Sequence, residues 1–356
     1  MRRASAATTR TDARLDEPIA PLGVEAVVTP ARRSPWQWAL LALGVVLLGG
    51  LVWGAGPQRL AAHLHALGWW TPVIFVPYAI ATAFDTMGWR ATFQHAPPPL
   101  GRLYVVRLIG EAVNSITPTA YLGGEPVKAY VLQRFGVPLA DGTTSVILAK
   151  TALTIAQIAF VILGVTLLFI HRGATWMTLP ILLAMLASGV GLTFLLVRWQ
   201  RRGPVASIAG LGARMLPRAR LTRTLQERAG EVDAKLLEFY EACRGAAVAS
   251  VVWHLIGWIA GAAEVFAIMT LIGHPVSWME AVIIEALAQP TRLLGLVVPG
   301  TLGVQEAGGM LIFGILGLPP ELGLALMLLK RVREIGFSAL GLALLAKVRL
   351  AEPLAA

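Results

Sequence analysis

The 356-residue chain has few of the features that mark a soluble enzyme. Only 14% of its residues are charged, and its single cysteine, Cys243, leaves no internal disulfide to form. No CxxC, HExxH or clustered-histidine pattern offers a metal site, and no motif for binding ATP is present. We therefore expect no metal and no other cofactor.

Hydrophobic residues dominate instead. They make up 56% of the chain, and the mean hydropathy is +0.68, as in polytopic helical membrane proteins. A helix needs about 20 apolar residues to cross a bilayer. The runs that approach this length are Trp36–Trp53, Trp69–Thr86, Ser145–Ile170, Trp176–Val197, Ala246–Ile272 and Leu322–Leu345. The sequence therefore predicts an all-α membrane protein with six transmembrane helices.

The basic residues are distributed unevenly along this chain of net charge +10. Six arginines precede residue 36, and ten Lys or Arg lie between Arg198 and Arg244, whereas the linkers on the other side hold only Arg59 and Arg172. This is the positive-inside pattern, with both termini in the cytoplasm. It predicts contact of the basic linker with anionic inner-leaflet lipids, and no binding of nucleic acid.

Charge and hydropathy together divide the chain into five parts. The expected parts are a disordered basic tail (1–35), a first membrane half (36–197), a basic cytoplasmic linker (198–245), a second membrane half (246–346) and a cytoplasmic tail (347–356). Apolar residues at helical spacing between Leu221 and Tyr240 predict an amphipathic helix in the linker, lying along the inner leaflet.

The chain contains an internal repeat. The stretch PTAYLGGEPVKAYVLQRFGVPLA, residues 118–140, aligns without a gap with PGTLGVQEAGGMLIFGILGLPPE, residues 299–321, at an offset of 181. Glu125 then matches Glu306. With the N-terminus inside, the two motifs enter the membrane from opposite faces. This is the inverted repeat of many secondary transporters.

Proline and glycine interrupt the apolar sequence in both motifs. Proline ends a helix, and glycine permits close approach or unusual backbone angles. We expect two re-entrant hairpins, over residues 103–135 and 279–317, with tips near the membrane midplane. Eight plain spans joined by ordinary loops are the alternative. The residues expected at the hairpin breaks are Pro118, Gly123, Gly124, Pro299, Gly300 and Gly303.

Ionisable side chains within spans are costly unless they are paired or hydrated, so each is a candidate site residue. Helical spacing allows the pairs Arg107–Glu111, Glu125–Lys128 and Lys330–Glu334 to neutralise themselves. The candidate substrate-binding residues are Glu125, Lys128, Lys150, Glu264, Glu285, Glu306 and Arg331.

Duplication is the reason for favouring the two motif glutamates. Glu125 and Glu306 are expected to line one central cavity, with the matched cations Lys150 and Arg331 within salt-bridge reach of a carboxylate or a head group. His254 lies on the same helix face as Glu264. It is either a packed structural histidine or a proton carrier.

Three motifs resemble a known family. GGEPVKAYVLQRFGV, WHLIGWIAGAAEVF and PGTLGVQEAGGMLIFGILGLPPEL, the last followed by LLKRVRE, are similar to motifs of the lysylphosphatidylglycerol-synthase-type transmembrane, or flippase-like, family. The resemblance covers most of residues 36–346 and is strongest to members associated with hopanoid biosynthesis. It implies a bacterial inner-membrane protein that moves lipid. It also implies that Glu125, Lys128, Glu264, Glu306 and Arg331 occupy family motif positions.

These observations predict a lipid transporter or flippase, not an enzyme. The favoured cargo is a hopanoid-type amphipathic lipid or, failing that, an anionic lipid such as a polyprenyl phosphate. Aminoacylating family members carry a large soluble domain after the membrane part, whereas this chain ends ten residues past its last span, so we expect no aminoacyl transfer. The alternatives are an intramembrane transferase with Glu125 or Glu306 as base, and a scaffold for hopanoid-synthesis or export proteins.

Overall fold

The computed structural model describes residues 68–94, 96–117, 123–173, 178–207, 219–294 and 301–350, together with residues 46, 49–54, 57, 58 and 61. These residues form helices and no strands, so the predicted all-α class is confirmed. The tail 1–35, most of the first expected span and residues 351–356 lie outside the described residues. So do the expected hairpin-break residues Pro118, Pro299 and Gly300.

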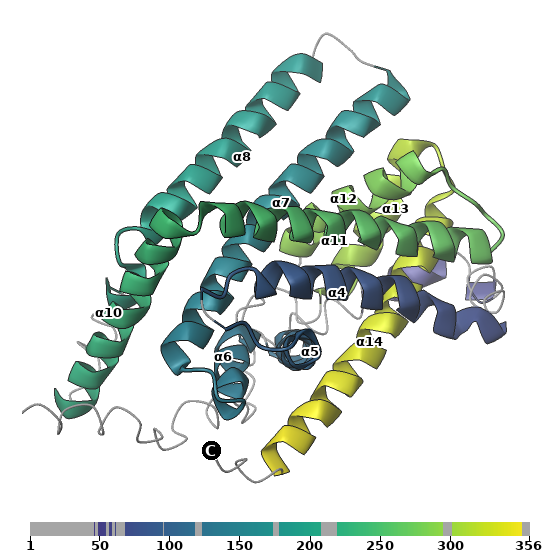
Figure 1. Ribbon diagram of the computed structural model, residues 1–356. Helices are drawn as coiled ribbons and strands as arrows, with labels where there is room; N and C mark the ends of the chain where they lie inside the picture. Colours follow the sequence, from purple (N-terminus) through teal and green to yellow (C-terminus); the bar gives the residue numbers. More distant parts are fainter. Residues whose placement is uncertain are drawn as a thin grey trace, which may run out of the picture.

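Figure 1 shows the arrangement of the helices. They are η2 (Gly68–Ile74), α4 (Phe75–Arg90), α5 (Leu100–Ile116), α6 (Gly124–Arg134), α7 (Leu139–Arg172), α8 (Thr178–Gln200), α10 (Ala219–Ala242), α11 (Arg244–Leu271), α12 (Trp278–Leu294), α13 (Val304–Leu316) and α14 (Pro320–Leu350).

Three of the described helices are long and apolar enough to cross a membrane. They are Leu139–Arg172, Leu179–Gln200 and Arg244–Leu271, which contain three of the expected spans almost whole. Most side chains of α8 are apolar yet exposed, among them Phe194 and Leu195 at 60% and 61%. This surface is stable against lipid tails rather than water. The chain is therefore a multi-pass helical membrane protein.

Two helical hairpins are present, and in each the two helices are separated by the break of a Pro/Gly motif. α5 packs against α6 across the first break, and α12 packs against α13 across the second. The first crossing is tight, because a Cβ on Gly124 would lie 2.0 Å from the carbonyl oxygen of Gly110. Gly303 precedes α13 with a φ of +79°, which favours glycine. Glycine at these breaks thus has a steric reason.

The offset that aligns the sequence motifs also aligns the helices. Shifted by 181 residues, α5, α6 and α7 fall on α12, α13 and α14 to within three residues at each end. Each hairpin packs on a helix of the other half, since α5 contacts α14 and α12 contacts α7. In Figure 1 the equivalent helices α7 and α14 run in opposite directions, and α4 lies antiparallel beside its equivalent, α11.

The linker helix α10 differs from expectation in its surroundings. Its apolar residues Val232, Leu236 and Phe239 are buried, and they pack with Leu148 of α7. Burial also raises the pKa of Tyr240 to about 12. These apolar residues therefore face the protein, because the N-terminal part of α7 offers them an apolar surface. The expected contact of the linker with the inner leaflet stays a prediction.

Candidate functional site

A large cavity lies between the two halves. Its volume is about 1260 Å³, and its walls come from α4, α5, α7, α8, α11, α12 and α14. One side is polar and charged. The other side is apolar, where Val161 and Ile162 of α7 face Ile181, Met185 and Leu192 of α8. The cavity is thus amphiphilic, and it exceeds the roughly 300–1,000 Å³ of pockets that hold drug-sized ligands.

An alternating chain of ion pairs borders the cavity at the first hairpin. Successive charged groups lie 3.1 to 3.8 Å apart. In order, its six members are Asp85, Arg107, Glu111, Lys128, Glu125 and Lys150. The two pairs expected from helical spacing are present, and Lys128 links them. Three acids balance three bases, so the group is neutral when all six are ionised.

The second half holds two shorter chains. The first runs Arg292–Glu334–Arg331–Glu306, and the second runs Arg333–Glu264–Lys330–Glu285. The prediction that Lys330 pairs with Glu334 is wrong. Although the two residues are one turn apart on α14, Lys330 is only 3% exposed and pairs with Glu264 of α11 and Glu285 of α12. Here too, four acids balance four bases.

The two motif glutamates lie in different surroundings. Glu306 is fully buried, and it accepts hydrogen bonds from the backbone N–H of Gly303 (2.8 Å) and from Arg331 (2.8 Å). It closes the start of α13 and is not among the residues that line the large cavity. Glu125 lines a small adjoining cavity of about 20 Å³. The expectation that both glutamates line one central cavity is therefore wrong.

The matched cations lie where the repeat predicted. Lys150 Nζ is 3.6 Å from Glu125 Oε1, and Arg331 Nη2 is 2.8 Å from Glu306 Oε1. Salt-bridge reach at both matched positions is thus confirmed. Of the candidate site residues, the structure places Lys150, Glu264, Glu285 and Arg331 on the cavity wall, with Glu125 and Lys128 in the adjoining space.

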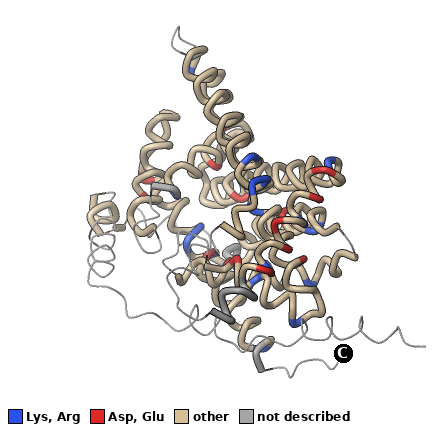
Figure 2. Tube along the Cα trace, turned by 90° about the vertical axis from the view of Figure 1, so that its left-hand side faces the viewer, with Lys and Arg blue, Asp and Glu red and all other residues tan. Residues whose placement is uncertain are grey.

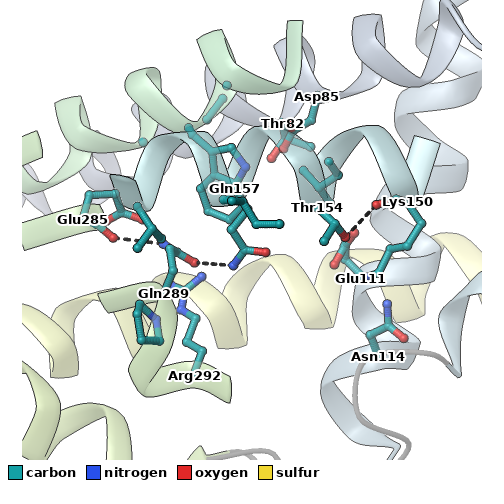
Figure 3. A pocket seen from close by; sticks show the side chains of 18 of the residues that line it. Thr82, Asp85, Glu111, Asn114, Lys150, Thr154, Gln157, Glu285, Gln289 and Arg292 are labelled. Atoms are coloured by element: carbon teal, nitrogen blue, oxygen red, sulfur yellow. Dashed lines mark hydrogen bonds between the residues drawn. The ribbon is translucent and has the colours of Figure 1, made fainter. Parts of the chain in front are cut away.

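Uncharged polar side chains lie between the charged groups. Figure 3 shows Gln157 of α7 pointing toward Gln289, to which its Nε2 donates over 3.4 Å. Gln289 in turn donates to Glu285 over 3.1 Å. Thr154 and Asn114 also line the space. A polar group placed here would meet amides and hydroxyls, which donate and accept hydrogen bonds without adding charge.

Several of these residues are not among the candidates that the sequence indicates. Gln157 stands alone in the middle of a long apolar helix, which was a usable signal. Asp85 and Arg333 lie in or beside expected spans and carry the same signal. Asn114 closes the first hairpin by accepting a hydrogen bond from the backbone N–H of Gly124, 2.7 Å away. That role depends on the fold and left no pattern in the sequence.

Charges gather where the helices cross, as Figure 2 shows for acidic and basic residues at the centre of the bundle. Within the described residues, no group of three or more His, Cys, Asp or Glu is arranged to hold a metal ion. The described side chains at the site are ion pairs and amides beside an apolar wall.

The fold and this site define a multi-pass helical membrane protein with an amphiphilic cavity between two related halves. The chain belongs to the family described as "Lysylphosphatidylglycerol synthase TM region", which matches residues 37–341. It is also similar to a "UPF0104 membrane protein" of Methanothermobacter thermautotrophicus, with 27% identity over 141 residues. That match covers 36% of this chain and 40% of the relative. No solved structure matches.

The resemblance to the family is thus confirmed, and the family indicates a function connected with membrane lipid. The particular nearness to members associated with hopanoid biosynthesis stays a prediction.

Proposed function

We propose that the protein moves a hopanoid-type amphipathic lipid between membrane leaflets. The observation that carries the proposal is the two-sided cavity of about 1260 Å³, polar at the hairpins and apolar along α8. A lipid has the same division. Its head group would lie among the ion pairs and amides, while its apolar body lies along α7 and α8.

The position of α8 supports a lateral passage for the apolar body. α8 packs on α7 and, weakly, on α10, and its cavity-facing residues are backed by an outer surface that is itself apolar and exposed. Figure 1 shows it beside α7, away from α14. Among the described helices, α8 alone would therefore separate this side of the cavity from lipid. Its movement would open the cavity without exposing the apolar body to water.

The charge balance favours an uncharged head group. Five acids and five bases line the cavity: Asp85, Glu111, Glu264, Glu285 and Glu334 against Arg107, Lys150, Arg292, Arg331 and Arg333. An anionic head group would have to take a cation from an existing pair and leave a carboxylate uncompensated, which costs several kcal/mol in a buried site. A hydroxylated head group needs only the amides and hydroxyls.

An anionic lipid such as a polyprenyl phosphate is the second candidate, and one residue favours it. The side chain of Lys150 is 36% exposed, and Glu125, its partner, also bonds with Lys128. Lys150 is therefore the cavity cation most easily turned toward a phosphate. The transferase alternative has less support, because Glu306 is sealed behind Arg331 and Glu125 is held by two lysines.

The repeat supports alternating access as the means of movement. Two halves that run in opposite directions and exchange hairpins can rock about their shared contact, which opens the cavity to each leaflet in turn. In this proposal the hairpins are re-entrant, six helices span a bacterial inner membrane, and both termini are cytoplasmic. The basic linker contacts anionic lipids, and hopanoid-synthesis or export proteins are candidate partners.

Leaflet exchange in proteoliposomes tests the proposal. The full chain is reconstituted with a labelled, hydroxylated triterpenoid in one sample and a labelled polyprenyl phosphate in another. We expect faster exchange of the triterpenoid than in protein-free vesicles, and a loss of about tenfold in Gln157→Leu, equal to about 1.4 kcal/mol. The control is Gln226→Leu, on the exposed surface of α10. Exchange of neither lipid above the protein-free rate would overturn the proposal.

A further inference from the structure

A buried histidine lies behind the cavity, where α4 crosses α11. The side chain of His254 is fully buried, and its Nδ1 is 2.7 Å from Oδ1 of Asp85. Its second ring nitrogen, Nε2, has no hydrogen-bond partner among the described residues. A neutral imidazole has one nitrogen that donates and one that accepts. If Nδ1–H donates to Asp85, Nε2 remains as an unused, buried proton acceptor.

Glycines at the crossing of α4 and α11 leave space for the Asp85–His254 pair. A Cβ on Gly88 of α4 would lie 2.8 Å from His254 Nε2, and a Cβ on Gly257 of α11 would lie 2.9 Å from Asp85 Oδ1. Ser250 holds the helices together by donating to the carbonyl oxygen of Gly88 over 2.8 Å. Side chains larger than hydrogen at these glycines would displace the ring or the carboxylate. The pair is therefore part of the contact between the two halves.

Asp85 connects this pair to the cavity. Its side chain is 19% exposed and lines the cavity, and its Oδ2 accepts a hydrogen bond from Arg107 over 3.1 Å. The charged groups that act on His254 are Asp85 of α4, Arg107 of α5 and Lys128 of α6. Lysine and arginine keep their charge at physiological pH, whereas histidine changes charge near neutrality. The pair is therefore the group through which the neutral balance of the first ion-pair chain can change.

We propose that Asp85 and His254 form a proton-binding site that couples lipid binding to pH. The pair takes up one proton, which rests on Nε2 of His254, while Nδ1–H continues to donate to Asp85. The first ion-pair chain then carries one positive charge in excess. The charged imidazolium attracts the Asp85 carboxylate more strongly than the neutral ring does, so Asp85 accepts a hydrogen bond from a head-group hydroxyl less favourably. This step rests on the proposed function, since it assigns the lipid head group to the same cavity.

The direction of coupling follows from linkage. If a bound proton weakens lipid binding, bound lipid weakens proton binding by the same factor. Lipid then binds on the proton-poor side of the membrane and leaves on the proton-rich side, in exchange for a proton. The contact of α4 with α11 joins the two halves, so the proton acts where one half would rock against the other.

Two measurements on the full chain test the coupling. The first follows the imidazole signals of histidine-labelled protein by NMR between pH 5 and 8, without lipid, and we expect His254 to titrate in this range. The second measures binding of a hydroxylated triterpenoid, and we expect wild-type affinity to fall about tenfold from pH 8 to pH 5, within the 5–150-fold of typical couplings. His254→Gln should bind with the same affinity at both values.

His171→Gln is the matched control. Its Nε2 lies 3.8 Å from Glu280, so it too pairs with a carboxylate, but it lies at the end of α7 and does not line the cavity. It should keep the wild-type pH dependence. A His254 ring that does not titrate, or a His254→Gln variant with unchanged pH dependence, overturns the proposal.

Two further readouts keep the test decisive. If His254→Gln does not fold, the coupling is judged from the wild-type titration and from the pH dependence of triterpenoid binding in an Asp85→Asn variant. The titration is read without lipid, so it stands even where the probe does not bind. Leaflet exchange that is fast but independent of pH overturns only the coupling, whereas titration and pH-dependent binding without exchange overturn only the transport.

Discussion

In the first repeat Glu125 pairs with Lys150, and in the second Glu306 pairs with Arg331, at positions 181 residues apart. The surroundings of the two pairs differ. In the first, the lysine side chain is 36% exposed, whereas in the second the arginine is 17% exposed and the glutamate is fully buried. The two repeats thus hold the same pair at matched positions but in different solvation.

The difference extends to some other members of the ion-pair groups, although Arg107 and Lys128 of the first half are also buried, and Arg292 and Glu334 of the second half are each 27% exposed. The side chains of Glu264, Lys330 and Arg333 in the second half are at most 4% exposed, whereas that of Glu111 in the first half is 37% exposed. Buried charges hold their partners rigidly, because separating them leaves a charge unpaired in a medium of low dielectric constant. The pairs around Glu264 therefore form a fixed support, whereas Glu111 and Lys150 lie on a more hydrated part of the wall, where the proposed head group could replace existing contacts.

Removing the two matched cations should show this contrast most strongly. Arg331→Ala strands the buried carboxylate of Glu306, so we expect a loss of about 3–5 kcal/mol in the free energy of unfolding. Lys150→Ala leaves Glu125 with Lys128, and the removed group is partly exposed, so a loss of about 1 kcal/mol or less is expected. Unfolding of each variant in detergent measures the difference. Equal losses would remove the distinction between the two halves.

A pair of matched glycines tests the packing of the two hairpins. Gly142 and Gly323 occupy equivalent positions in α7 and α14. A Cβ on Gly323 would lie 2.4 Å from the carbonyl oxygen of Gly309, whereas one on Gly142 would lie 3.5 Å from that of Ala129. Gly323→Ala should therefore destabilise by about 1–3 kcal/mol through overpacking.

The same substitution in the first half should have the opposite sign. Gly142→Ala meets only ordinary contacts, and alanine is favoured over glycine within a helix by about 1 kcal/mol. We expect unchanged or slightly higher stability, read by the same unfolding measurement. A destabilised Gly142→Ala with an unaffected Gly323→Ala would mean that the first hairpin, not the second, is the tightly packed one.

Much of the fold could be predicted from the sequence because its signals are local. The hairpins expected over 103–135 and 279–317 correspond closely to α5–α6 and α12–α13. Proline and glycine act on the backbone within a residue or two, and an apolar run acts through its length alone. The repeat needed only a comparison of the chain with itself.

The site was less accessible to sequence reasoning because its contacts are long-range. Spacing offers Lys330 a partner on its own helix, but the packing of α14 brings Glu264 and Glu285, from two other helices, to the lysine instead. Likewise, the repeat gives Glu125 and Glu306 equal standing. The positive φ of Gly303 turns the backbone so that Glu306 bonds to it and is sealed from the cavity. Such differences depend on how elements pack, which spacing does not encode.

The smallest effect is expected at the linker helix α10, which packs mainly on the first repeat and less extensively on α11 of the second. The linker helix α10 packs on α7 of the first repeat, and Lys235 of α10 donates to Asp141 in the first turn of α7. Burial lowers the pKa of Lys235, but the hydrogen bond and charge of Asp141 outweigh it, so the pKa lies above its ordinary value of 10.5. A raised lysine pKa stabilises the folded state below pH 10.5, and the gain is lost as pH rises through the folded-state pKa.

Asp141→Asn should therefore cost up to about 1 kcal/mol at pH 8, and the cost should shrink at more alkaline pH. Since Lys235 is partly exposed, added salt should reduce the cost as well. Hydrogen exchange of the α10 backbone, compared between wild type and variant at pH 8 and in low and high salt, measures it. Tyr240, whose own raised pKa acts in both proteins, cancels from the comparison. Identical exchange at pH 8 would mean that the apolar contacts of Val232, Leu236 and Phe239 hold α10 on the first half without the ion pair.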